Sequence, residues 1–215
     1  MGRVVVVGAG VVGLSVSRAA LLSGHEVTLL EQGSIANSNA ASYDQHRMIR
    51  YQYGDAEGYT RMVGDAFDAW DRLWDDLGVR HFSNTGTMGI SLAAEDYTAR
   101  SLSTFRKLGI PHEVLDRDAV ERTCPQLSLP VASWGLLSSP FLRQGDRYKP
   151  VRMQVGYYVM DASGRFRVEA QGRAVVITNC DGQMFKFGPL IGARVIESFD
   201  GKQSAADLNR WAAGY

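Results

Sequence analysis

The sequence predicts an α/β fold, with a Rossmann-like β-α-β unit at the N-terminus and an α+β region after it. Three observations support this prediction. A β-branched run at residues 3–7 leads directly into a glycine-rich turn, the next residues have helical character, and a second apolar run at residues 25–30 ends in an acid. A strand, a tight turn, a helix and a second strand in this order are typical of parallel nucleotide-binding sheets.

The N-terminal elements follow from residue type and from the placement of glycine. Residues 3–7 read Arg-Val-Val-Val-Val, which suits a strand that is buried on both faces. Leu14–Ser23 is predicted to be a helix that ends at Gly24. His25–Leu30 is predicted to be the second strand, so a complete β-α-β unit precedes residue 31.

The region from residue 59 to residue 124 is predicted to alternate helices with strands. Apolar residues at three- and four-residue spacing predict an amphipathic helix from Tyr59 to Leu77, whose aromatic stripe is most simply core. The elements expected after it are a strand over 85–92, a helix over 94–108, a strand around 112–115 and a short helix that ends at Cys124. Asp118 is the candidate N-cap of that short helix.

The last third of the chain has a weaker pattern. Low periodicity and two prolines predict a loop over residues 128–147. Alternating apolar side chains predict a long strand over Tyr148–Met160. Residues 174–177 form a β-branched run that predicts another strand, and a helix is expected over Gly188–Phe199, with Pro189 in its first turn.

The composition excludes several classes of function. Lys plus Arg and Asp plus Glu each number 23, so no net charge attracts the chain to nucleic acid or to anionic membranes. No apolar run is long enough to span a bilayer. Cys124 and Cys180 lack the spacing of a disulfide framework or a zinc site, so no metal is expected. These features predict a cytoplasmic protein.

The glycine-rich turn has a GxGxxG pattern at Gly8, Gly10 and Gly13. The first glycine permits a tight turn, the second lets a pyrophosphate approach the backbone, and the third lets the helix pack closely on the strand. The N-terminus of the helix that follows the turn, with Val12 next to it, would offer N–H groups to phosphates. Glu31 is placed to accept hydrogen bonds from a ribose, which disfavours NADP and leaves FAD and NAD open.

Two further segments resemble those of one enzyme family. Ser42 and the run Arg47–Gly54 (RMIRYQYG) are similar to the segment after the ribose acid in D-amino-acid-oxidase-type flavoproteins, which include sarcosine and glycine oxidases. The segment Asp181–Gly192 contains a Phe-Lys-Phe sequence, which resembles the family motif that passes the flavin ring and starts the last helix. The two matches are widely separated and stand in the order that the family has.

This resemblance implies an FAD-dependent oxidoreductase that oxidises the C–N bond of an amine or amino acid by hydride transfer to the flavin. It implies a discontinuous FAD-binding domain, residues 1–45 plus 172–215, around a reduced substrate domain, residues 46–171. The match to the family breaks between residues 130 and 147 and again between residues 160 and 174. Family members are longer, so the middle of the chain is the part that is shortened.

The resemblance also assigns site residues. Arg50 and Lys186 match the cationic pair that binds the substrate carboxylate, and Arg47 matches an arginine near the flavin ring. Neither Cys124 nor Cys180 matches the cysteine to which sarcosine oxidases attach flavin, so noncovalent FAD is expected. The other residues expected at the cofactor, besides the glycines, Val12 and Glu31 named above, are Gln32, Ser42, Gly182, Met184, Phe185 and again Lys186.

The expected partner is a small-molecule amine or amino-acid substrate, not nucleic acid or a membrane. The long strand at Tyr148–Met160 would have few sheet neighbours in its own chain, so self-association into a homodimer is expected. Two alternatives to an active oxidase stay open. One is a flavin-binding module without catalytic activity, and the other is a partial flavoprotein that a partner chain completes.

Overall fold

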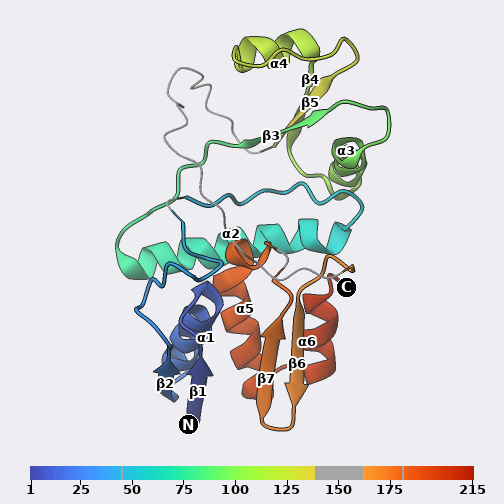
Figure 1. The fold of residues 1–215 in the computed structure, drawn as a ribbon. Helices are drawn as coiled ribbons and strands as arrows, with labels where there is room; N and C mark the ends of the chain where they lie inside the picture. The colour runs from blue at the N-terminus through green and yellow to red at the C-terminus, as the bar shows by residue number, and fades with distance from the viewer. Residues whose placement is uncertain (45, 139–161, 181) are drawn as a thin grey trace. The chain divides into compact units, whose positions relative to one another are not determined.

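The structure is a computed structural model, and it describes residues 1–44, 46–138, 162–180 and 182–215 (Figure 1). Contacts divide the chain into two compact units, and each is described by itself. Unit 1 comprises Met1–Ile49, Met62–Val79 and Val155–Tyr215, and unit 2 comprises Arg50–Arg61 and Arg80–Gln154. Unit 1 is discontinuous, as the predicted cofactor domain is, and the predicted domain boundaries themselves stay a prediction.

Unit 1 begins with the predicted β-α-β unit. Strand β1 (Arg3–Val7), helix α1 (Val11–Leu22) and strand β2 (Glu26–Leu30) follow one another, and β1 pairs with β2 in parallel. Helix α1 begins earlier than the predicted Leu14, because Gly10 is its N-cap and the Gly10 carbonyl accepts the Leu14 N–H over 2.9 Å. The prediction therefore identified the element but placed its first turn too late.

The C-terminal part of unit 1 consists of a hairpin and two helices. Strands β6 (Arg167–Gln171) and β7 (Ala174–Thr178) pair antiparallel, and helices α5 (Met184–Phe199) and α6 (Ala205–Ala212) follow them. The predicted strand at 174–177 is confirmed. Strand β6 and helix α6 were not predicted, because both are short elements with charged residues on their exposed sides.

Helix α5 begins one turn before the predicted start at Gly188, so the prediction that Pro189 lies in the first turn is wrong. Met184 is buried, and the indole Nε1 of Trp70 donates to the carbonyl oxygen of Lys186 over 2.8 Å. These tertiary contacts stabilise a helical turn ahead of the proline, whose position removes only one backbone donor.

Helices α1 and α5 pack against each other as a close parallel pair (Figure 1). A Cβ atom added to Gly192 would lie 2.4 Å from the carbonyl oxygen of Ser15, and one added to Gly188 would lie 2.8 Å from Cγ2 of Val11. The contact point advances by four residues on both helices, so their N-termini lie at the same end of unit 1. The buried residues around this pair include Val6, Val16, Ala20, Phe187, Ile191 and Val195.

Helix α2 (Glu57–Leu77) runs from unit 2 into unit 1 and confirms the predicted amphipathic helix. It begins two residues before the predicted Tyr59. Its apolar stripe is its buried side, as the spacing predicted. The fully or nearly buried members of the stripe are Tyr59, Met62, Val63, Ala66 and Trp70.

Unit 2 is an antiparallel sheet with two helices. Strands β3 (Thr87–Ser91), β4 (His112–Asp116) and β5 (Trp134–Ser138) have the order β3-β5-β4. Helices α3 (Tyr97–Leu108) and α4 (Arg117–Thr123) pack on this sheet. The predicted strands at 85–92 and 112–115 and the helix at 94–108 are confirmed, with shorter or shifted ends.

The central strand of unit 2 contradicts the predicted loop over 128–147. Strand β5 pairs along its whole length with β3 on one edge and β4 on the other, and Leu136 is completely buried. A Cβ at Gly135 would lie 2.6 Å from Val120 of α4, so the glycine allows close packing and does not mark a turn. A strand covered on both faces has no apolar–polar alternation, and this is why its pattern was missed. The predicted strand Tyr148–Met160 lies outside the described residues.

Acidic N-caps set the helix starts in unit 2. Asp96 caps α3 with its carboxylate, so that helix begins at Tyr97. Asp116 accepts the backbone N–H of Ala119 over 2.8 Å, so Asp116 and not the predicted Asp118 caps α4. Strand β4 runs directly into α4, and the last strand residue therefore takes the N-cap position.

Three further observations concern the described residues as a group. None of their helices is both long and apolar enough to cross a membrane. No cluster of three or more His, Cys, Asp or Glu side chains among them could hold a metal ion. Cys124 and Cys180 are both free thiols.

Candidate functional site

The glycine-rich turn joins β1 to α1 in a conformation that other residues would strain. Gly8 has φ +99°, and its N–H donates to the Leu30 carbonyl over 2.7 Å. A Cβ atom on Gly13 would lie 1.8 Å from the Gly8 carbonyl oxygen. The first and third glycines of the motif therefore have the roles that the sequence predicted, a tight turn and close packing.

The N-terminus of α1 leaves backbone N–H groups for a ligand. Gly10, the N-cap, has φ −70° and has no side chain that could cap the helix. The first-turn N–H groups of Val12 and Gly13 have no acceptor within the helix, and no described residue supplies one. Ser42 Oγ accepts the Val11 N–H over 3.2 Å, so the structure brings the predicted Ser42 to this turn. The open N–H groups and the positive end of the helix dipole would therefore stabilise an anion bound at the N-terminus of α1.

Glu31 joins the end of β2 to the glycine turn. Its Oε2 accepts the Ala9 N–H over 2.7 Å, and its Oε1 accepts the Gly33 N–H over 3.1 Å and the Asn37 amide over 3.3 Å. The bond from Ala9, followed by those from Asn37 and Gly33, lowers the pKa of the Glu31 carboxyl below its ordinary range. Glu31 is therefore a charged acceptor beside the turn, and the predicted Gln32 follows it as an exposed residue.

The N-terminus of α5 is a second helix end in unit 1 that presents backbone N–H donors. Because α1 and α5 are parallel, it opens at the same end as the glycine turn, and α5 begins one turn ahead of the residue that meets Val11. Gly182, with φ +65°, precedes the helix and is exposed, and Met184 is buried at its start. The structure therefore brings the two sequence motifs of the site to one end of unit 1.

An aromatic and cationic stack surrounds Phe185. The Arg47 guanidinium carbon lies 5.7 Å from the centre of the Phe185 ring, and the Trp70 ring stacks on Phe185 at 5.5 Å. Arg47 also pairs with Asp44 and donates to the backbone carbonyl of Tyr43 over 2.9 Å. The structure therefore brings the predicted Arg47 and Phe185 together.

The predicted cationic pair is divided between the two units. Lys186 is buried in unit 1, where its Nζ donates to the Gln183 carbonyl over 3.4 Å. Arg50 belongs to unit 2, where it contacts Tyr97 and Gln52. The joint role of the two cations therefore stays a prediction.

Sequence reasoning missed two residues that shape the site. Asn37 holds the Glu31 carboxylate, and Trp70 holds the start of α5 through its ring and its Nε1 donor. Trp70 stands in the aromatic stripe of α2, which predicted only burial. Asn37 carries no periodic signal, and only its position six residues after Glu31 could have drawn attention to it.

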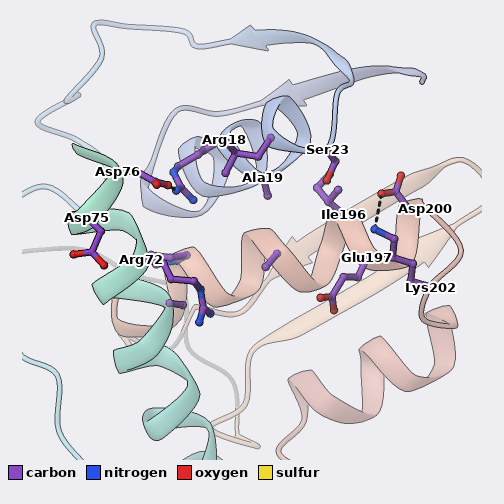
Figure 2. Close-up of a pocket in the computed structure, with 14 residues that line it drawn as sticks. Arg18, Ala19, Ser23, Arg72, Asp75, Asp76, Ile196, Glu197, Asp200 and Lys202 are labelled. Atoms are coloured by element: carbon purple, nitrogen blue, oxygen red, sulfur yellow. Dashed lines mark ion pairs between the residues drawn. The ribbon is translucent and has the colours of Figure 1, made fainter. Parts of the chain in front are cut away.

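A cavity of about 450 Å³ opens elsewhere in unit 1, among α1, α2 and α5 (Figure 2). Its wall on α1 starts at Arg18 and so lies toward the end of the helix remote from the glycine turn. Several of its charges are paired with each other: Arg18 with Asp76, and Lys202 with Asp200 over 3.6 Å. The lining of this cavity does not include the glycine turn.

The residues at the glycine turn fit a dinucleotide. The turn combines two open N–H donors, a glycine N-cap that leaves room for a phosphate, and an ionised carboxylate at the end of the second strand. This donor set suits the pyrophosphate and ribose of an adenine dinucleotide.

Comparison with known proteins supports this interpretation. Residues 3–140 match the family model described as DAO, FAD dependent oxidoreductase. Peroxisomal sarcosine oxidase of Homo sapiens is 24% identical over 135 residues, covering 63% of this chain and 34% of that protein. Monomeric sarcosine oxidase of a Bacillus species is 21% identical over 128 residues, covering 59% of this chain and 33% of that protein.

A solved structure has a similar fold. The open form of NikD, described as an unusual amino acid oxidase essential for nikkomycin biosynthesis, is 26% identical with a TM-score of 0.56, covering 64% of this chain and 36% of that one. The chain thus spans about a third of the length of the curated relatives it matches. The similarity covers the glycine turn, Glu31 and the Arg47–Gly54 run, all of which lie within residues 3–140.

Proposed function

Because the chain belongs to the DAO family of FAD dependent oxidoreductases, we propose that it binds FAD noncovalently and oxidises the C–N bond of an amine or amino acid. The observation that carries the proposal is the shared end of α1 and α5, where two helix N-termini open beside Glu31 and Phe185. When bound, FAD supplies the acceptor for a hydride from the C–H bond beside the substrate nitrogen.

Each predicted site residue has a role in this proposal. The turn at Gly8, Gly10 and Gly13 receives the pyrophosphate on the N–H groups around Val12, with Ser42 beside them. Glu31 accepts hydrogen bonds from the adenosine ribose, and the backbone of the adjoining Gln32 lies next to that sugar. The flavin ring then meets Arg47 and four residues of the second motif, Gly182, Met184, Phe185 and Lys186.

The substrate in this proposal carries a carboxylate near the oxidised bond. Arg50 binds it through a planar guanidinium, which suits bidentate recognition, and Lys186 adds a point charge. The alternatives of an inactive flavin module or a partial flavoprotein are not favoured, because the relatives are named as oxidases.

The test of this function uses the purified 215-residue chain. We expect flavin absorbance bands, and acid precipitation should release the yellow colour into the supernatant because no covalent link forms. Added amino acids or N-methyl amino acids should bleach the bands under anaerobic conditions. A colourless protein would refute FAD binding, colour in the pellet would refute noncovalent binding, and bands that no such substrate bleaches would refute the oxidase.

A homodimer and a cytoplasmic location are part of the same proposal. Both cysteines are free thiols, the state that reducing compartments maintain. Support for the homodimer comes from the β1–β2 sheet of unit 1. One face of β1 and β2 is solvent-exposed, so the prediction that residues 3–7 are buried on both faces, as is ordinary for parallel sheets, is wrong. On this face Val7 is 83% exposed and Val5 is 63% exposed.

The same face has charges that complement a second copy of itself. Its cross-strand pairs are Arg3 with Glu26, Val5 with Thr28 and Val7 with Leu30. Neither Arg3 nor Glu26 forms an ion pair with any described residue. If a twofold axis along the strands placed β1 over the partner's β2, each Arg3 would meet a Glu26 and the valines would be covered.

Light scattering tests the homodimer at micromolar concentration. The wild type should have twice the 23.6 kDa mass of the chain. The change Val5→Lys should produce monomers, because the interface would bury an unpaired charge. The matched control is Val131→Lys, at an exposed valine of unit 2 (86% exposed), and it should stay dimeric. A monomeric wild type, or dimers in both variants, would rule this interface out.

A further inference from the structure

Arg50 is enclosed by hydrogen bonds within unit 2. Its Nη1 donates to the carbonyl oxygen of Gln52 and, over 2.9 Å, to the hydroxyl oxygen of Tyr97. The Tyr97 hydroxyl in turn donates to the same Gln52 carbonyl over 2.7 Å. The three groups form a closed triangle in which the Tyr97 hydroxyl both accepts and donates. Both N–H groups of Nη1 are therefore used in hydrogen bonds within the protein.

Two aromatic rings hold the guanidinium in addition. Its Cζ lies 5.4 Å from the centre of the Tyr53 ring and 5.6 Å from the centre of the Tyr97 ring. Both distances are within the range of a cation–π interaction. Tyr97 thus contacts Arg50 twice, through its ring and through its hydroxyl, whereas Tyr53 meets it through its ring.

The backbone keeps Tyr97 in this place. Tyr97 is the first residue of α3, directly after the N-cap. Its ring lies over Gly54, where an added Cβ would be only 3.2 Å from the ring. The Gly54 N–H donates to Ser101 Oγ over 2.8 Å, and the Gly54 carbonyl accepts from Thr104 Oγ1 over 2.7 Å. These bonds join the segment that carries Arg50 to the helix that carries Tyr97.

The other edge of the guanidinium is available. Nε and Nη2 of Arg50 make no hydrogen bond or ion pair with any described residue, and this edge is the one that binds a carboxylate with two parallel bonds. Arg47 differs, because Asp44 already pairs with it. Of the two arginines in the Arg47–Gly54 run, Arg50 is therefore the one that is arranged to bind an anion.

We propose that Tyr97 is a positioning residue, which orients Arg50 so that its Nε–Nη2 edge receives the substrate carboxylate. The inference rests on the proposed function, in which Arg50 binds that carboxylate. Tyr97 itself acts on Nη1, away from the edge that meets substrate. Its hydroxyl restrains the orientation of the Arg50 side chain. Arg50 therefore loses less conformational entropy when the carboxylate binds.

The test compares three variants of the flavin-loaded chain. Tyr97→Phe keeps the ring and removes the hydroxyl. Arg50→Lys keeps the charge and removes the bidentate edge. Tyr53→Phe is the matched control, because that residue meets Arg50 through its ring. The probe is cyclohexanecarboxylate, which has no oxidisable C–N bond, and cyclohexanecarboxamide is its uncharged analogue. Titration calorimetry gives both dissociation constants.

We expect Tyr97→Phe to weaken cyclohexanecarboxylate binding by about 3- to 10-fold, the effect of one hydrogen bond. Carboxamide binding and the Tyr53→Phe variant should be unchanged. In turnover, KM for an amino acid should rise with kcat nearly constant. The ¹⁵N signal of the Arg50 Nε–H, identified by its loss in Arg50→Lys, should broaden in Tyr97→Phe because the side chain gains freedom. Unchanged melting temperatures verify that the variants fold.

The outcomes separate this inference from the function on which it rests. If Arg50→Lys leaves carboxylate binding unchanged, Arg50 is not the carboxylate site, and the proposed substrate recognition fails. If Arg50→Lys weakens binding but Tyr97→Phe does not, Arg50 binds the carboxylate without help from Tyr97, and the inference is overturned. Equal loss for carboxylate and carboxamide in Tyr97→Phe would also overturn it, because the effect would then be structural.

Discussion

Replacing Gly13 by alanine should destabilise the protein, whereas the same change at Gly10 should leave the fold intact and weaken FAD binding. A Cβ on Gly13 would lie 1.8 Å from the Gly8 carbonyl oxygen, and no side-chain rotation can relieve a contact with backbone. Helix α1 would have to move away from β1. Overpacking of this kind costs about 1–3 kcal/mol or more, which corresponds to about 2–12 °C in melting temperature for a chain of this size.

The Gly10→Ala variant isolates the effect on the ligand. Gly10 has φ −70°, which alanine adopts readily, and the nearest atom to an added Cβ is Ser42 Oγ at 3.5 Å. That Cβ would occupy the space at the N-terminus of α1 that a phosphate must enter. We expect an unchanged melting temperature without flavin, and FAD binding weaker by at least about tenfold.

Thermal melting of the flavin-free protein and a flavin titration check both variants. The two variants should therefore differ in what they change: Gly13→Ala should lower the melting temperature, and Gly10→Ala should lower the affinity for FAD. Normal FAD affinity in Gly10→Ala would mean that the pyrophosphate does not lie on this turn. A normal melting temperature in Gly13→Ala would mean that the close contact with Gly8 is absent.

Replacing Glu31 by alanine should weaken FAD binding by about 10- to 100-fold, because a charge-assisted hydrogen bond to the ribose is lost. The matched control is Glu31→Gln, which keeps an acceptor oxygen for the Ala9 N–H but loses the charge, and it should lie between the wild type and the alanine variant. Fluorescence titration with FAD measures all three. Equal dissociation constants would show that Glu31 does not reach the ribose.

The Glu31 carboxylate also predicts how stability depends on pH. Its pKa is lowered in the folded protein, chiefly by the Ala9 N–H, so the charged form is favoured on folding. The stabilisation is present above the pKa of an unfolded glutamate, about 4.3, and is lost as the pH falls through the lower folded value. The difference in melting temperature between wild type and Glu31→Gln should be constant near neutral pH and shrink in this acidic range. A difference that persists at low pH would refute the linkage.

The sequence by itself was sufficient to predict the secondary structure around the glycine turn of unit 1. Strand, turn, helix and second strand were predictable because the information is local: a β-branched run, three glycines at fixed spacing and an acid at the strand end. The long helix α2 was predictable because its apolar spacing persists over many turns. Family resemblance added Ser42, Arg47 and Phe185, and the structure brings these residues to the same unit as the glycine turn.

Only the tertiary structure decided the remaining features, and the reason is that they depend on contacts between distant segments. Strand β5 has no alternation because both its edges and both its faces are occupied. The early start of α5 depends on Trp70, which is more than 100 residues away. The parallel pairing of α1 with α5 depends on Gly188 and Gly192, whose small size matters only because another helix lies against them. The restraint of Arg50 by Tyr97, 47 residues later, is invisible to spacing, because a hydrogen bond across a fold leaves no period in the chain.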